Sequence, residues 1–246
     1  MNNLWKYIII SSAIVLAAIV LAGAYTQRYR TNNGSITVTG LGETEFTSDI
    51  IVVNATFSTE NYDAAEGYRM MESNRREIEE FLKEHGVSSE DISFDMLSSY
   101  KMTNSVYEEG KYIGERFAGY RLTQSFSIES NDVEAVEEAA RGLSSLIGEG
   151  ISIEVDNPMY FFSKLESVKL DLIAAAAADA RQRAELIANN SNAGLGTLIW
   201  SRAGVFQITA ATGDEEFSAG GSFNLSSREK KARVTVRSEF KIANIQ

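Results

Sequence analysis

The sequence has 246 residues, a formal net charge of −11, no cysteine and a single histidine. The lack of cysteine excludes disulfides, thiolate nucleophiles and cysteine-ligated metals within this chain, and one histidine excludes most multi-histidine metal sites. The acidic balance argues against a nucleic-acid partner, because phosphate binding needs clustered lysine and arginine.

An uncharged run from residue 7 to residue 27 dominates the N-terminal part of the chain. As a signal anchor, its apolar residues are numerous enough to span a hydrocarbon core of about 30 Å as a helix. As a signal peptide, it offers Ala22-Gly23-Ala24 as a cleavage signal, with cleavage after Ala24.

Both interpretations place the rest of the chain outside the cytoplasm. The protein is membrane-anchored with a periplasmic or extracellular domain if the segment is kept, and it is secreted or periplasmic if the segment is cleaved. We assign 1–30 to the anchor or signal peptide with its linker, and 31–246 to a folded domain.

Two strand patterns follow the linker. Residues 35–41 alternate apolar side chains with threonine, and residues 49–59 are rich in β-branched residues. The second strand is expected to bury Ile51, Val53, Ala55 and Phe57 on one face. We interpret Gly40 and Gly42 as the turn between the two strands.

Residues 61–84 have helical periodicity, with Asp63 and Glu66 spaced as a capping box. The apolar stripe of this helix consists of Tyr68, Met71, Ile78, Phe81 and Leu82. His85 falls in the last turn, where a cation is favoured by the helix dipole, so we give it a structural role.

Residues 91–106 and 116–130 are predicted to form two long strands joined by a turn-rich loop at 107–114. Five aromatic residues flank this hairpin: Tyr100, Tyr107, Tyr112, Phe117 and Tyr120. They either pack across the strands or form an exposed aromatic tip used in assembly or against a membrane surface.

A second helix is expected over 131–147, starting at Asn131 and burying Ile147, followed by a strand at 151–160 that Pro158 interrupts. The longest helix is predicted over 163–190, with Ser163 and Glu166 as a capping box. Its run of alanines at 174–180 gives a small-residue face that suits flat packing on a sheet.

Two final strands, 197–208 and 228–242, enclose a long Gly/Ser/acidic loop. The order from 49 to 160 is that of a ferredoxin-like βαββαβ unit. The fold class is therefore α+β with mainly antiparallel sheet, in which that unit is extended by an N-terminal strand, the long Ala-rich helix and two C-terminal strands.

Motifs for chemistry are largely missing. Carboxylates follow Gly40-x-Gly42, which is unsuitable for phosphate binding, and Asp214-Glu215-Glu216 is typical of a solvated acidic loop rather than a metal site. We therefore assign no catalytic, cofactor-binding or metal-ligating residue and expect no cofactor.

The order and spacing of several short motifs resemble the SIMPL-domain family, over about residues 35–242. The motifs are Ile36-Thr37-Val38-Thr39-Gly40-x-Gly42 with Asp49, Gly119-Tyr120, Gly150-Ile151-Ser152-Ile153, Ala178-Asp179-Ala180-Arg181-x-x-Ala184, Val205-Phe206-Gln207-Ile208-Thr209, and 227–236. The Gly-rich acidic loop at 213–221 departs from the family pattern.

The resemblance implies an α+β fold, an extracytoplasmic location and, in some members, assembly into ring-like oligomers. It also implies a link to envelope or oxidative-stress phenotypes. We expect a non-enzymatic envelope protein that forms a homo-oligomer and contacts the membrane through 7–27. The alternatives are a monomeric module that binds an unidentified ligand or protein, and a hydrolase using a carboxylate pair.

Overall fold

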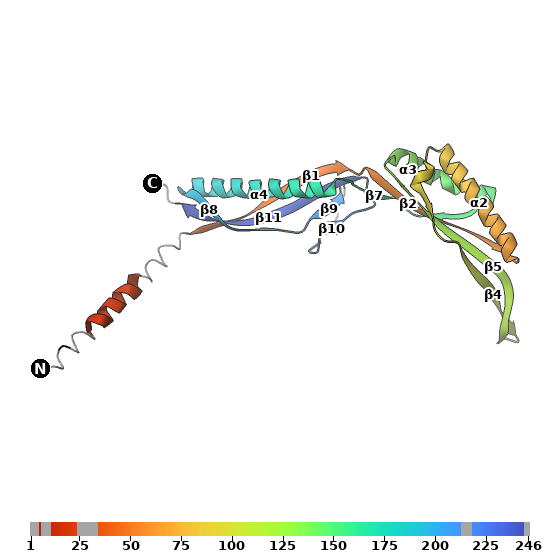
Figure 1. Ribbon diagram of the computed structural model, residues 1–246, viewed down its shortest axis with the longest axis horizontal. Helices are drawn as coiled ribbons and strands as arrows, with labels where there is room; N and C mark the ends of the chain where they lie inside the picture. Colours follow the sequence, from red (N-terminus) through yellow and green to blue (C-terminus); the bar gives the residue numbers. More distant parts are fainter. Residues whose placement is uncertain (1–4, 6–10, 24–33, 213–217, 244–246) are drawn as a thin grey trace. The chain divides into compact units, whose positions relative to one another are not determined.

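The computed structural model describes residues 5, 11–23, 34–212 and 218–243 (Figure 1). The protein is α+β with two mostly antiparallel sheets, as the sequence predicts. It divides into two compact units. The first comprises Met1–Glu43, Leu170–Val205 and Arg233–Gln246, and the second comprises Thr44–Lys169 and Phe206–Ala232.

Within the predicted anchor, residues 11–23 are helical and their side chains are exposed. The flanking parts of the 7–27 run, and the cleavage position after Ala24, lie outside the described residues. Among the helices that are described, none combines the length and apolar character needed to cross a bilayer.

The first unit is built on the strands β1 (Ser35–Thr47), β8 (Gly194–Ala203) and β11 (Glu229–Ala243). β11 pairs with β1 and, antiparallel, with β8. Helix α4 (Leu165–Asn190) lies along this sheet (Figure 1). The inward residues of β1 and β11 and the facing side of α4 form a small core, whose buried members are Ile36, Val38, Ala180, Ala184, Ala188 and Phe240.

The prediction of a turn at Gly40 and Gly42 is wrong, because β1 runs without interruption through both glycines. Their role is close packing. A Cβ atom on Gly42 would lie 2.2 Å from the carbonyl oxygen of Leu172 on α4. The alanine-rich side of α4 does pack on the sheet, as predicted, with Ala176 and Ala180 fully buried.

In the second unit, a six-stranded sheet has the order β3-β5-β2-β6, with β4 also paired to β5 and β7 to β2. Helices α2 (Ala64–Glu84) and α3 (Val133–Gly142) pack against it. Its strands are β2 (Ile50–Asn61), β3 (Ile92–Phe94), β4 (Ser98–Glu108), β5 (Lys111–Ser130), β6 (Ser152–Val155) and β7 (Met159–Phe161).

The predicted inward face of β2 is confirmed, since Ile51, Val53, Ala55 and Phe57 are at most 2% exposed. These side chains join the buried side of α2 and α3 in the main core. Between β6 and β7 the chain leaves the strand conformation near Pro158, as expected for a residue that cannot donate to a sheet.

The helix boundaries need correction. The N-cap of α3 is Asp132, which accepts from the Ala135 N–H, rather than Asn131. Beyond Gly142 the chain tightens into the 3-10 helix η2 (Leu143–Glu149). Because a 3-10 helix has three residues per turn, Leu146 is buried below Leu143, and Ile147 is exposed.

The predicted stripe of α2 holds for Met71, Ile78 and Leu82 but not for Tyr68, which is 52% exposed. Gly67 faces the sheet instead, where a Cβ atom would lie 2.7 Å from Leu122 Cδ1. Asp63 is the N-cap, as predicted, and accepts from the N–H groups of Ala65 and Glu66.

Ser163 does not cap α4, which begins at Leu165. Its hydroxyl and its backbone N–H instead donate to the Asp49 carboxylate, at 2.5 and 2.7 Å. A tertiary partner has displaced the local capping interaction that the sequence pattern favours.

The C-terminal strands also differ from the prediction. The stretch 197–208 contains the end of β8 and the start of β9 (Gln207–Ala210), and β8 already begins at Gly194. The predicted loop contains the short strand β10 (Ser222–Phe223), which pairs in parallel with β9. The last predicted strand corresponds to β11.

Candidate functional site

The β4–β5 hairpin is exposed along nearly all of β4 and along the first half of β5. Its strands pair as far as Glu108 and Lys111. The turn is Glu109-Gly110, with φ of 50° and 80°, the two positive values that characterise a type I′ turn. The predicted loop at 107–114 is therefore wrong, because most of its residues belong to the strands.

The outer part of this hairpin has only two strands. β2 pairs with β5 up to Tyr120, so beyond that point the strand that pairs with β5 is β4. We call residues 102–119 the ribbon. Among the described residues no third strand pairs with it, which leaves the backbone groups along both of its edges open (Figure 1).

Aromatic side chains line the ribbon and remain accessible. Tyr107 and Tyr112 stack edge to face across the strands, with ring centroids 5.9 Å apart, yet they are 64% and 52% exposed. Phe117, 40% exposed, lies 6.2 Å from the ring of Tyr62. The structure thus supports both roles considered for these aromatics, cross-strand packing and an exposed surface.

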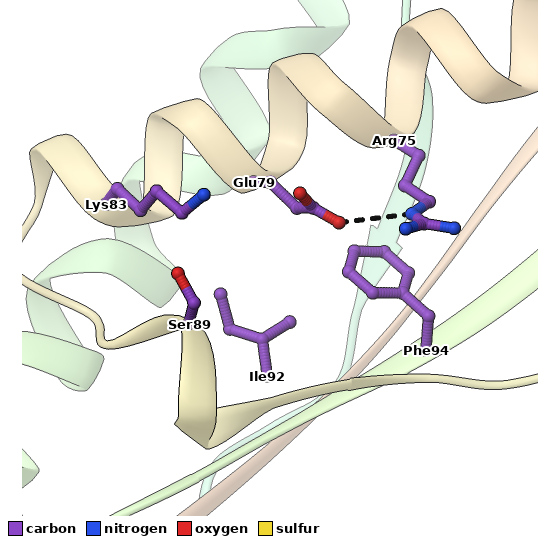
Figure 2. A pocket seen from close by; sticks show the side chains of 6 residues that line it. All are labelled: Arg75, Glu79, Lys83, Ser89, Ile92 and Phe94. Carbon is purple, nitrogen blue, oxygen red and sulfur yellow. Dashed lines mark hydrogen bonds and ion pairs between the residues drawn. The ribbon is translucent and has the colours of Figure 1, made fainter.

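A groove lies on another side of the second unit, between α2 and β3 (Figure 2). Its volume is about 320 Å³. Helix α2 contributes Arg75, Glu79 and Lys83, one residue per turn along the same side. The opposite wall is made by Ser89, Ile92 and Phe94.

Contacts on the far side fix Phe94 in the groove. Its ring packs against Phe126 and Phe57, at centroid distances of 5.2 and 6.4 Å. The guanidinium of Arg75 lies over the same ring, 5.1 Å from its centroid, and Arg75 Nε donates to Glu79 Oε1 at 3.1 Å. The charges of Arg75 and Glu79 therefore compensate each other.

A second cavity of about 380 Å³ lies beside α3 and β7, and its lining includes Glu137, Arg141, Asp156 and Tyr160. The Tyr160 hydroxyl donates to Glu137 Oε1 at 2.7 Å. Burial, together with this hydrogen bond to a carboxylate, raises the pKa of Tyr160 to about 12. The phenol is thus kept in its neutral, donating form.

Among the described residues, three carboxyl groups have a lowered pKa, and each accepts hydrogen bonds from a different set of donors. Burial acts to raise the pKa of Asp49, but hydrogen bonds from Ser163 outweigh it. The Leu41 N–H and then Arg183 lower the pKa of Asp179, and Ser35 and then Trp200 lower that of Glu239. None of the three is paired with a second shifted carboxyl, so they give no support to acid–base work by a carboxylate pair.

The remaining candidates of the sequence are placed as follows. His85 Nδ1 donates to the Phe81 carbonyl at 2.8 Å and its ring stacks on Phe81, which is a structural role. Asp214, Glu215 and Glu216 lie outside the described residues. Within the described part of the chain, no group of three potential metal ligands is found.

Sequence reasoning missed the groove. Arg75, Glu79 and Lys83 are not part of the apolar stripe that periodicity predicts for 61–84. The periodicity did not indicate that Ile92 and Phe94 come to lie beside that row. The four-residue spacing of the charged side chains was the available signal.

Fold and site thus define an α+β protein with two mostly antiparallel sheets and an open two-stranded ribbon. Its described residues form no assembled catalytic centre. A family model described as SIMPL, protein of unknown function (DUF541), matches residues 36–240. The chain therefore belongs to the SIMPL family. No curated relative matches it.

Proposed function

We propose that this protein is a non-enzymatic component of the cell envelope that acts by self-assembly. The observation that carries the proposal is the ribbon, whose two strands continue beyond the sheet with open edges. An isolated two-stranded hairpin is marginally stable in water, and an open strand edge is a template for pairing with another chain.

The chemistry of the ribbon favours a second copy of this chain as the partner. Residues 102–107 of β4 are uncharged, whereas charged residues are a common protection of strand edges against pairing. Tyr107, Tyr112 and Phe117 supply the exposed aromatic area that is enriched in protein interfaces. Pairing along β4 would satisfy backbone groups that water satisfies in the single chain.

We propose further that the second unit is ferredoxin-like. Its element order is β2, α2, β3 with β4, β5, α3, and β6 with β7. Its sheet places β5 and β2 in the centre and the other strands outside. This arrangement supports a split βαβ topology, which would make the ribbon an extension of one internal hairpin.

The assembly proposal is tested by light scattering on the full chain in detergent micelles, with the detergent mass subtracted. We expect a discrete oligomer for the wild type and a monomer for Tyr107→Glu, because a carboxylate in the interface would be buried without a partner. Met96→Glu is the matched control, since Met96 is 95% exposed and lies outside the ribbon. A wild type that stays monomeric at all concentrations contradicts the proposal.

We also propose that 7–27 holds the protein in the membrane, with 31–246 periplasmic or extracellular. The support is the uncharged run itself and the exposed apolar side chains of its described part, among them Leu16 and Leu21. Membrane extraction at alkaline pH and N-terminal sequencing test this. Recovery of a soluble protein that begins after Ala24 would favour the cleaved alternative.

A further inference from the structure

We propose that the groove between α2 and β3 binds a small organic carboxylate with an apolar or aromatic body. Its volume of about 320 Å³ is at the lower end of the range for small-molecule sites. It belongs to the second unit and lies apart from the ribbon, so this binding would be independent of assembly.

The charge of the groove selects an anion. Glu79 is already paired with Arg75, so the ammonium of Lys83 is the cation left without a compensating group. Its side chain makes no hydrogen bond or ion pair within the described part of the chain. The lining thus carries a net charge of +1, in a chain whose net charge is −11.

Lysines in the last turn of a helix are commonly explained by the helix dipole alone. The opposite wall argues for more than that here. Figure 2 shows Ser89 across the groove from Lys83. The same wall continues with Ile92 beside Ser89 and Phe94 opposite Arg75, and we call these two apolar side chains the floor. A hydroxyl donor and an ammonium on facing walls match the two oxygens of one carboxylate.

The floor selects an apolar body on that carboxylate. Ile92 and Phe94 are only half-buried in the protein, and the packing of Phe94 on Phe126 holds its ring in place. Arg75 already lies over the Phe94 ring, so a ligand gains hydrophobic contact with Ile92 and with the part of Phe94 that remains exposed. An inorganic anion would use Lys83 but would leave this floor in water.

The test uses the full chain in lipid nanodiscs with ¹³C-methyl-labelled isoleucine, in which the Ile92 methyl reports on the groove. The probes are 3-phenylpropionate, its neutral analogue 3-phenylpropanamide, and inorganic phosphate. We expect phenylpropionate to change the chemical shift of the Ile92 methyl group in a saturable way. Binding should be at least about fivefold weaker for the amide, which lacks the charge contact, and for phosphate, which lacks the apolar contact.

Two exposed positions allow variants that keep the fold. Lys83→Gln should remove the preference for the acid over the amide. Ser89→Glu should weaken the binding of the acid, because it places a carboxylate opposite Lys83. Lys164→Gln, at an exposed position outside both the groove and the ribbon, is the control that removes the same charge elsewhere in this unit. The proposal is overturned if no saturable shift appears, if the amide or phosphate binds as tightly as the acid, or if Lys83→Gln leaves the preference unchanged.

Discussion

Gly40 of β1 lies so close to Ala176 of α4 that a Cβ atom on the glycine would be 2.1 Å from the alanine's carbonyl oxygen. The same atom would lie 2.3 Å from the backbone nitrogen of Ala180. The strand and the helix therefore touch through backbone atoms, which a side chain at position 40 would separate. Backbone cannot yield as the end of a flexible side chain can.

Gly40→Ala should accordingly destabilise the protein by about 2–4 kcal/mol, the upper part of the range for overpacking and beyond. Urea unfolding monitored by circular dichroism measures this. Gly148→Ala is the matched control, because Gly148 has no atom within 4 Å of an added Cβ and should be neutral or slightly stabilising. Equal effects of the two substitutions would mean that α4 is free to move away.

Asp179 of α4 accepts the Leu41 N–H of β1 at 2.7 Å and pairs with Arg183 at 2.9 Å. These contacts lower the pKa of Asp179 in the folded protein below its unfolded value near 3.9. The group therefore stabilises the fold above the unfolded pKa, and this contribution is lost as the pH falls through the folded pKa.

Asp179→Asn should lower the urea midpoint at pH 7, and the difference from the wild type should shrink toward pH 3. Asp171→Asn is the control on the same helix, because Asp171 makes no side-chain hydrogen bond or ion pair within the described part of the chain. A difference that is the same at both pH values would show that the charge of Asp179 contributes nothing.

Tyr160 should ionise at a higher pH than an ordinary tyrosine, since its pKa is raised to about 12. A raised folded pKa means that stability is fully present below the unfolded value near 10 and is lost as the pH rises toward 12. Tyr160→Phe should remove the component near pH 12 from the tyrosinate absorbance titration. It should also cost about 1 kcal/mol at pH 7 through the lost bond to Glu137. Tyr62→Phe, at a position 74% exposed, should do neither.

Two substitutions in the turn of the ribbon should have opposite effects on the stability of the ribbon. Glu109 has a positive φ that asparagine adopts more readily, so Glu109→Asn should protect the Lys111 amide, which donates to the Glu108 carbonyl in a type I′ turn, against hydrogen exchange. Gly110→Val meets no atom within 4 Å but must adopt φ of 80°, and it should open the ribbon by roughly 1–2 kcal/mol. Changes of the same sign in both variants would contradict the turn assignment.

Local patterns predicted most elements because each rests on interactions between near neighbours. The alternation of Ile51 with Val53 fixed the buried face of β2, and Asp63 was identified as the start of α2 from its capping pattern. The errors occurred where a distant residue competed. The Ser163 hydroxyl donates to Asp49 instead of capping α4. β1 continues through Gly40, where a turn was predicted, and packs closely against α4 there.

The two candidate surfaces show the same division. The sequence determined that the hairpin is rich in aromatics and that α2 has one apolar stripe, because side-chain periodicity is a local property. Only the tertiary structure decided that β2 ends before the ribbon does, that Phe94 lies against Arg75, and that Ser89 lies across the groove from Lys83. Strand pairing and helix packing join residues far apart in the chain, so periodicity specifies which face is buried but not which element covers it.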